Sequence, residues 1–305
     1  MDVSVVFATR DRADLLEATL GHLARQQAGG RAWEVVVADN GSTDRTPAVL
    51  RAAAARLPLV TVSEPIPSKN RALNRALDVV RGRLLLFTDD DVVPEEDWVA
   101  RMAAAADRWP QHAIFAGRIT PLFPGGTPDW LRAHPFSDHA FARFELAQEE
   151  GPITTLPYGP NFMVRAAAMV GVRYNEAIGP SGEDYVSGSE TELLLRLSRQ
   201  GCGVVWVPDV SVAHVIRPDQ LDVSWLLGRS YRRGRCFVEL GFIRPDPGPR
   251  VAGVPVRTWA QLVKEWVYQL SGTLGDPERR FLRGLDYHFI RGCIRQYRLR
   301  ARRAP

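Results

Sequence analysis

Short apolar runs alternate with amphipathic segments along the first third of the chain. The apolar runs cover residues 3–8, 34–39, 59–62 and 84–88. Uninterrupted apolar runs are typical of strands buried on both faces of a parallel sheet, and the segments between them have apolar side chains at helical spacing. This alternation predicts an α/β fold with a mostly parallel sheet, right-handed crossovers and helices on both faces.

Capping residues mark the expected helix starts. The first helix opens at Asp11 or Arg12, and the second starts at Thr46 with Pro47 at its first position. Ser68 is expected to cap a third helix that ends at Gly82.

After Pro94 the regular alternation ends. Residues 121–158 are rich in proline, glycine and aromatic residues, and a connection of this length is typical of a lid or binding loop. From residue 222 onward the pattern is mainly helical, with a proline-rich interruption at 244–256. The other expected elements are helices at 98–109 and 190–200, and strands at 114–120, 161–165, 203–207 and 210–215.

Three consecutive carboxylates, Asp89, Asp90 and Asp91, directly follow the apolar run at 84–88. Ligands of open α/β sheets bind at the carboxyl ends of the strands. Adjacent like charges repel one another, so a cation is expected beside them, and oxygen ligands favour Mg²⁺ or Mn²⁺ bridging to a substrate phosphate. The alternative is a solvated loop after a strand.

The composition is that of an ordinary globular protein, with 305 residues, 45% hydrophobic and 24% charged. The net charge is +4, and residues 291–303 hold six arginines and no acid. This basic tail fits contact with phosphates or an anionic membrane surface, or alternatively a solvated helix end. Nucleic-acid binding is disfavoured, because acids are nearly as numerous as bases and no aromatic-interleaved basic motif occurs.

Cys202, Cys236 and Cys293 lie far apart, so neither a disulfide framework nor a zinc site is expected. The N-terminus does not resemble a signal peptide, and no apolar stretch approaches the length of a membrane span. These features predict a cytoplasmic protein whose membrane contact, if any, is peripheral.

Several segments together resemble a known family. They are VSVVFATRDRADLL (3–16), VVVADNGSTDRT (35–46), SKNRALNRAL (68–77), LLLFTDDDV (84–92), YGPNFMVR (158–165), GSETELLLRL (188–197) and VAHV (212–215). In order and spacing they are similar to family 2 inverting glycosyltransferases, over about residues 2–235. The resemblance implies the Rossmann-like GT-A fold and transfer of a sugar from a UDP- or dTDP-type donor to an acceptor hydroxyl, with Mn²⁺ or Mg²⁺ as cofactor.

The resemblance also implies a division of the chain. Residues 1–235 would form the catalytic domain, with a nucleotide-sugar half at 1–93 and an acceptor half at 94–235 that includes the loop 121–158. Residues 236–305 would form a C-terminal helical extension. The acceptor could be a carbohydrate, a lipid-linked glycan or a small molecule. The sequence also leaves open whether the chain forms a homodimer.

On the donor side, the resemblance implies that Asp39 reads the base and that Thr9 and Arg10 contact it through the backbone. For Ser42, Thr43 and Asp44 simple turn chemistry is preferred. Lys69 and Arg71 would add charge to a helix N-terminus that favours phosphate, although a solvated first turn is the alternative for each.

Within the aspartate triplet, the resemblance implies that Asp91 binds the metal and Asp89 faces the ribose or a metal-bound water. Asp90 would point away and make a supporting hydrogen bond, because alternate side chains on an extended chain face opposite sides. His214 is a candidate ligand of the metal or the diphosphate; the alternative is a core histidine.

An inverting transfer needs a base that deprotonates the acceptor. Where family members carry a Glu-Asp pair, this chain has Ser189 followed by Glu190, so Glu190 is ranked first, Glu192 second and Asp184 third. The alternative is that these acids only stabilise the start of a helix, because the helix dipole favours negative charge there.

Tryptophans and arginines complete the candidate contacts. Trp130 is expected to contact sugar and Trp206 to pack in the core, while Trp225 could stack on a sugar face. One or two of Arg217, Arg229, Arg232 and Arg233 would close over the phosphates.

Two other functions are weighed against this one. A sugar-1-phosphate nucleotidyltransferase is disfavoured because residues 8–12 lack the glycines of a triphosphate-binding loop. A non-catalytic protein that binds nucleotide sugars is the other alternative.

Overall fold

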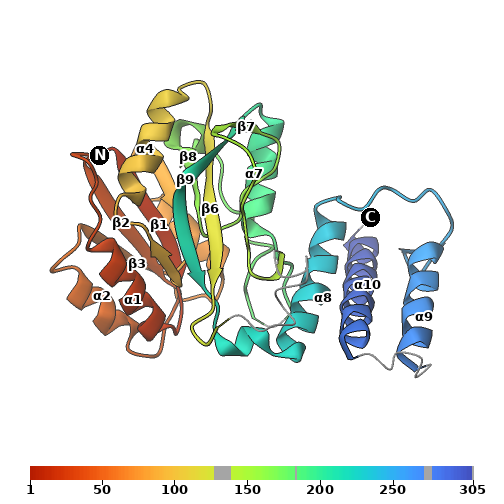
Figure 1. The fold of residues 1–305 in the computed structure, drawn as a ribbon. Helices are drawn as coiled ribbons and strands as arrows, with labels where there is room; N and C mark the ends of the chain where they lie inside the picture. The colour runs from red at the N-terminus through yellow and green to blue at the C-terminus, as the bar shows by residue number, and fades with distance from the viewer. Residues whose placement is uncertain (127–138, 183, 271–276, 304–305) are drawn as a thin grey trace. The chain divides into compact units, whose positions relative to one another are not determined.

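The computed structural model describes residues 1–126, 139–182, 184–270 and 277–303. The chain divides into two compact units (Figure 1). Of the described residues, the sheet unit contains 1–126, 139–182 and 189–216, and the helical unit contains 184–188 and 217–303. The contacts thus assign residues 217–235 to the helical unit, whereas the sequence analysis expected the extension to begin at residue 236.

The first half of the sheet is parallel, as predicted. β1 (Val3–Thr9), β2 (Trp33–Asp39), β3 (Leu59–Ser63) and β4 (Leu84–Phe87) lie in the order β3-β2-β1-β4. They are connected through α1 (Ala13–Leu23), α2 (Thr46–Ala53) and α3 (Lys69–Leu77). Every residue of β1 is buried, which explains its mostly apolar run, and the buried Ser4 hydroxyl donates a hydrogen bond to Glu34 at 2.6 Å.

The second half of the sheet is mixed. β8 (Phe162–Arg165) pairs antiparallel with β4 and with β6 (Ile114–Leu122), and β9 (Val204–Val215) runs parallel to β6. Two short strands, β5 (Val92–Pro94) and β7 (Gly151–Ile153), pair antiparallel with β9. The α/β fold is confirmed: the first four strands pair only in parallel with one another, whereas the second half combines the parallel pair β6 and β9 with antiparallel pairs.

The two strands expected at 203–207 and 210–215 are one strand, β9, interrupted by a bulge. Gly117 pairs with Val207, but the next residue, Arg118, pairs with Ser211. The buried side chain of Asn161 donates hydrogen bonds to the carbonyl oxygens of Arg118 (2.8 Å) and Val210 (3.1 Å) beside this shift. Residues 208–210 therefore form a bulge, and Asn161 satisfies carbonyl oxygens at it, so the strand continues.

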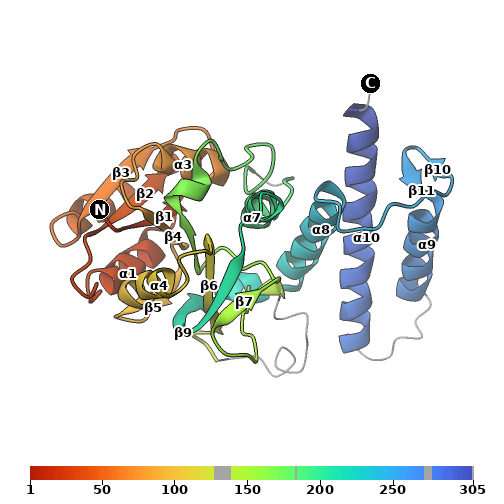
Figure 2. The same cartoon turned by 90° about the horizontal axis from the view of Figure 1, so that it is seen from above.

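Helices cover both faces of the sheet (Figure 2). α1 and α4 (Trp98–Arg108) lie on one face, and α3 and α7 (Ser189–Arg199) lie on the other. The largest fully buried side chains include Trp98, Trp206 and Phe7, so the predicted core position of Trp206 is confirmed. A short 3-10 helix, η1 (Ala166–Met169), follows β8.

Ser68 caps α3 as expected, since its hydroxyl accepts a hydrogen bond from the Arg71 backbone N–H at 3.4 Å. The helix ends at Leu77, earlier than the predicted Gly82. Residues 78–82 instead lead the chain into β4.

The helical unit consists of three long helices and a small hairpin. After the 3-10 helix η2 (Pro218–Leu221) come α8 (Val223–Glu239), the strands β10 (Arg250–Val251) and β11 (Val254–Pro255), α9 (Val256–Leu270) and α10 (Pro277–Arg303). α10 lies between α8 and α9 in both ribbon views (Figures 1 and 2). In the described part of the chain, no helix combines the length and apolarity that crossing a bilayer takes.

Candidate active site

The candidate site is at the edge of the sheet where β1, β2 and β4 end. β9 runs in the same direction as these strands, because β4 and β6 are both antiparallel to β8 and β9 is parallel to β6. The carboxyl ends of these strands therefore bring Thr9, Asp39, the aspartate triplet and His214 to one edge. Sequence-distant residues are thus collected where α/β sheets bind ligands.

Asp90 is fixed by the loop that follows β1. The Thr9 hydroxyl donates a hydrogen bond to Asp90 Oδ2 at 2.7 Å, and Arg12 Nη1 lies 2.8 Å from Asp90 Oδ1. Burial raises the pKa of Asp90, although the charge of Arg12 acts in the opposite direction. In turn, the charge of Asp90 raises the pKa of Arg12 above its usual value. Asp90 thereby ties β4 to β1, in line with the supporting role expected for it.

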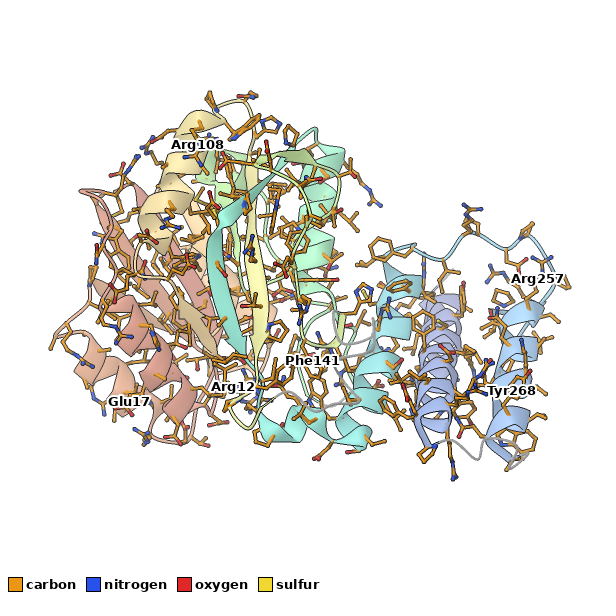
Figure 3. The ribbon with its side chains drawn as sticks, viewed as in Figure 1. Arg12, Glu17, Arg108, Phe141, Arg257 and Tyr268 are labelled. Atoms are coloured by element: carbon orange, nitrogen blue, oxygen red, sulfur yellow. The ribbon has the colours of Figure 1, made fainter. Side chains whose placement is uncertain are left out.

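Arg12 also contacts Asp91, with Nη1 at 3.2 Å from Oδ2. The sequence analysis treated Arg12 only as a helix start. Its position just after a buried strand, at the edge that holds the aspartates, was the available signal. Figure 3 shows Arg12 and Phe141 toward the same end of the sheet unit.

Asp91 and His214 form a buried pair, with His214 Nε2 at 3.4 Å from Asp91 Oδ1. The other ring nitrogen, Nδ1, lies 3.0 Å from the carbonyl oxygen of Phe141. Burial lowers the pKa of His214, but the charge of Asp91 outweighs it and the pKa lies above its usual value. The ion pair with Asp91 therefore favours the protonated ring.

These contacts fit a divalent cation. Metal-binding histidines commonly donate their second ring N–H to a backbone carbonyl, as Nδ1 of His214 is placed to do, which leaves Nε2 to face the metal and Asp91. Among the described residues, no three Asp, Glu, His or Cys side chains cluster closely enough to hold an ion by themselves. Mg²⁺-like ions typically use one or two carboxylates and complete their shell with water and substrate phosphates.

Lys69 links the aspartate triplet to α7. Its Nζ lies 2.7 Å from Asp89 Oδ1 and 2.9 Å from Glu190 Oε1. Burial lowers the pKa of Lys69, but the charges of Asp89 and Glu190 outweigh it and raise the pKa well above the usual value. The lysine is therefore charged at any ordinary pH and holds two carboxylates together.

Tyr174, which the sequence analysis did not select, lies beneath this group. Burial raises its pKa well above the usual value, and the charge of Glu190 adds to that effect. Its ring packs edge-on against Phe87, the last residue of β4. Tyr174 stands between Arg173 and Asn175, and this polar local sequence carries no signal of such a position.

The two glutamates at the start of α7 have different surroundings. Glu190 contacts Lys69, whereas both carboxylate oxygens of Glu192 bind Arg196 one turn later, at 2.8 and 2.9 Å. Asp184 belongs to the helical unit, where it pairs with Arg235 and Arg295. Of the three base candidates, the structure brings Glu190 to the aspartate triplet.

The loop after β2 is braced against the loop after β1. Asp39 Oδ1 accepts a hydrogen bond from the Ser42 backbone N–H at 3.0 Å, and the Asp11 carboxylate accepts one from the Thr43 N–H at 2.7 Å. Asp44 accepts hydrogen bonds from the backbone N–H groups of Ala13 and Thr46. These are turn contacts, as preferred for residues 42–44, and they hold Asp39 at the carboxyl edge.

The other candidate arginines have the following described contacts. Arg71 pairs with Glu176 at 3.0 Å, and exposed Arg10 lies 3.5 Å from Asp11. Arg217 pairs with Asp219, and the guanidinium groups of Arg229, Arg232 and Arg233 lie over Trp225, Tyr185 and Phe237. Trp130 lies outside the described residues.

Comparison with known proteins identifies the family. The sequence profile described as Glycosyl transferase family 2 matches residues 4–170, more than half of the chain. The chain belongs to this family. It is a glycosyltransferase, and the nucleotidyltransferase alternative is set aside.

The similar proteins agree with this assignment. Succinoglycan biosynthesis protein ExoM of Rhizobium meliloti is 26% identical over 79% of this chain and 75% of its own length. O-antigen biosynthesis protein RfbC of Myxococcus xanthus is 30% identical over 70% of this chain, but the match covers 17% of RfbC.

Solved structures show that the glycosyltransferase has the GT-A fold. The mannosyltransferase PcManGT from Pyrobaculum calidifontis, in complex with GDP-Man and Mn²⁺, has a TM-score of 0.62 and 19% identity, covering 96% of this chain and 86% of that chain. Residues 1–349 of TarS of S. aureus, in complex with UDP, have a TM-score of 0.57 and 16% identity, covering 97% of this chain and 92% of that chain.

Proposed function

We propose that the glycosyltransferase transfers a sugar from a UDP- or dTDP-type donor to an acceptor hydroxyl with inversion, using Glu190 as the general base. The observation that carries this proposal is the Lys69 bridge, with Nζ at 2.7 Å from Asp89 and 2.9 Å from Glu190. It joins the candidate base to the aspartate triplet, where donor and acceptor must meet for the transfer.

The donor side is supported by residues at the carboxyl edge of the sheet. Asp39 would accept the N3–H of a uracil or thymine ring, and the Thr9–Arg10 backbone would flank the base. Solved relatives bind UDP in one case and GDP-Man in another, so the fold by itself leaves the base open. The choice of UDP or dTDP rests on Asp39.

Asp91 and His214 would hold Mn²⁺ or Mg²⁺. A divalent cation bound there supplies a Lewis acid that neutralises charge on the departing diphosphate. The mannosyltransferase relative is described with Mn²⁺, which supports this cofactor. Asp89 would orient the ribose, while Lys69 adds a fixed positive charge beside it.

Glu190 would take the proton from the acceptor hydroxyl as that oxygen attacks the anomeric carbon opposite the leaving group. Lys69 keeps the Glu190 carboxylate beside Asp89 at the edge of the sheet. The Glu192 carboxylate pairs with Arg196. A substitution of Glu192 is therefore a suitable control for the same substitution of Glu190.

The test measures nucleotide release from UDP-sugars with Mn²⁺, to water and to added acceptors. Glu190→Gln should lower kcat by about 10²–10⁴-fold, the usual contribution of a general base. Glu192→Gln, on the same helical turn, should stay within about twofold, since a partly exposed ion pair contributes little. Undiminished turnover in Glu190→Gln would exclude it as the base. Donor binding without any turnover in the wild type would instead support the non-catalytic alternative.

A further inference from the structure

The helix α9 presents its apolar face outward. Val256, Ala260, Val263, Val267 and Leu270 are exposed and recur at helical spacing, so they form one continuous stripe along the helix. Trp266 borders the stripe and is 50% exposed, and Leu270 is 64% exposed. We call these six residues the α9 stripe.

The less exposed face of α9 is mixed: besides the apolar Trp259 and Leu262 it holds Glu265 and Tyr268. Glu265 is buried and pairs with Arg283 of α10 at 3.1 Å, and the Arg283 guanidinium lies over the Tyr268 ring. α9 packs against α10 and the short strand β11 and is the outermost helix of the unit in Figures 1 and 2. An amphipathic helix normally buries its apolar face, so this orientation indicates that a partner covers the stripe.

Charge indicates what that partner is. Residues 217–305 contain 18 Lys and Arg but 8 Asp and Glu, whereas residues 1–216 contain 21 and 27. The C-terminal segment is therefore strongly positive and the rest of the chain negative. Two cations, Arg257 and Lys264, are seven residues apart and flank the same side of the stripe. Figure 3 shows Arg257 at the outer side of the first turn of α9.

We propose that the α9 stripe docks on an anionic membrane surface. A helix with aliphatic side chains and a tryptophan on one face and flanking lysine and arginine is suited to lie in the interface between headgroups and acyl chains. Each cation near an anionic leaflet adds to the attraction. A second copy of the chain is the other apolar partner, but two such positive segments would repel one another. The proposal rests on the helical unit and does not depend on the proposed catalytic residues.

The test is co-sedimentation of the full chain with vesicles of phosphatidylcholine, with or without phosphatidylglycerol. The wild type should bind the anionic vesicles about tenfold more tightly than the neutral ones, and added salt should weaken that binding. Trp266→Ser with Val267→Ser should weaken binding by about tenfold or more, because both apolar contacts with the acyl boundary are lost. Arg257→Gln with Lys264→Gln should weaken binding to anionic vesicles alone.

Val170→Ser is the matched control, because it removes an 81% exposed valine from the sheet unit and should leave binding unchanged. Far-UV circular dichroism confirms that each variant is folded. The proposal is overturned if the wild type does not bind anionic vesicles, or if the Trp266 and Val267 variant binds like the wild type. A wild-type dimer that this variant converts to a monomer would also overturn it, in favour of self-association.

Discussion

Lys69 is the residue on which the proposed chemistry depends most, because its charge holds the carboxylates of Asp89 and Glu190 together. Replacing it with methionine keeps most of the side-chain volume but removes that charge. We expect Lys69→Met to lower kcat by about 10²-fold, the usual effect of removing one fixed electrostatic contact from an active site. Steady-state nucleotide release measures the change.

Lys69→Arg is the control for charge. It should recover part of the lost activity, because the guanidinium can reach both carboxylates but differs in shape. If Lys69→Met and Lys69→Arg lose activity equally, geometry rather than charge is the contribution of Lys69. If neither loses activity, the bridge has no part in catalysis.

His214 makes metal binding sensitive to pH. Its pKa lies above the usual value because the charge of Asp91 favours the protonated ring, so at low pH a proton occupies the position between Nε2 and Asp91. Mn²⁺ must displace that proton, and its affinity should therefore rise with pH through the range above the usual histidine pKa. Calorimetric titration of the protein with Mn²⁺ at several pH values measures the trend.

His214→Asn tests the role of His214 in Mn²⁺ binding by the same calorimetric titration, with no activity assay. It should weaken Mn²⁺ binding by about 10–100-fold and flatten its pH dependence, because no ring proton remains to be displaced. An unchanged affinity in His214→Asn would mean that the cation does not bind this histidine.

The sequence predicted the residues of the site better than their contacts. Asp89–Asp91 were recognisable because they interrupt an apolar run, and Glu190 because it starts an amphipathic helix. Arg12 was missed as a site residue, since its partners Asp90 and Asp91 are about eighty positions away. The difference between Glu190 and Glu192 also depends on long-range packing, which brings Lys69 to one and leaves the other to Arg196.

At the scale of elements, continuous apolar runs predicted the strands of the first half of the sheet, and Ser68 marked the start of α3. β9 was read as two strands because Pro208 and Asp209 look like a break, whereas Asn161 satisfies the carbonyls beside the bulge. The short strands β5 and β7 have three residues each, too few for any periodicity to appear. Their pairing is set by β9 rather than by their own sequence.

The crossing of α8 and α10 depends on two small residues. A Cβ on Gly234 of α8 would lie 2.0 Å from the carbonyl oxygen of Phe289, and a Cβ on Gly292 of α10 would lie 2.0 Å from that of Tyr231. Gly234→Ala should therefore force the helices apart and destabilise the helical unit by about 1–3 kcal/mol. Urea unfolding followed by circular dichroism measures the loss.

Gly228→Ala is the matched control on the same helix. Its added Cβ would meet only the end of the flexible Arg232 side chain at 3.2 Å, and alanine favours helix by up to about 1 kcal/mol over glycine. This variant should be unchanged or slightly more stable. Equal destabilisation by both substitutions would contradict the close crossing at Gly234.

At the scale of the whole molecule, the two units differ in how they are stabilised. The main apolar core extends from Val3 to Val212, entirely within the sheet unit. The helical unit buries fewer apolar side chains and contains a buried polar pair, with Arg235 Nε donating to Gln296 Oε1 at 3.0 Å. Since burial of apolar area is the dominant favourable term in folding, the helical unit should be the less stable of the two.

Two thermal transitions are therefore expected in differential scanning calorimetry, the lower one from the helical unit. Gly234→Ala should lower the midpoint temperature of the first transition only. UDP with Mn²⁺ should raise the midpoint temperature of the second transition only, because a ligand stabilises the unit that binds it. At a ligand concentration of about one hundred times Kd, the free energy of unfolding of that unit should increase by about 2.7 kcal/mol. A single transition moved by both the substitution and the nucleotide would show that the units unfold together, and that the helical unit draws its stability from the sheet unit.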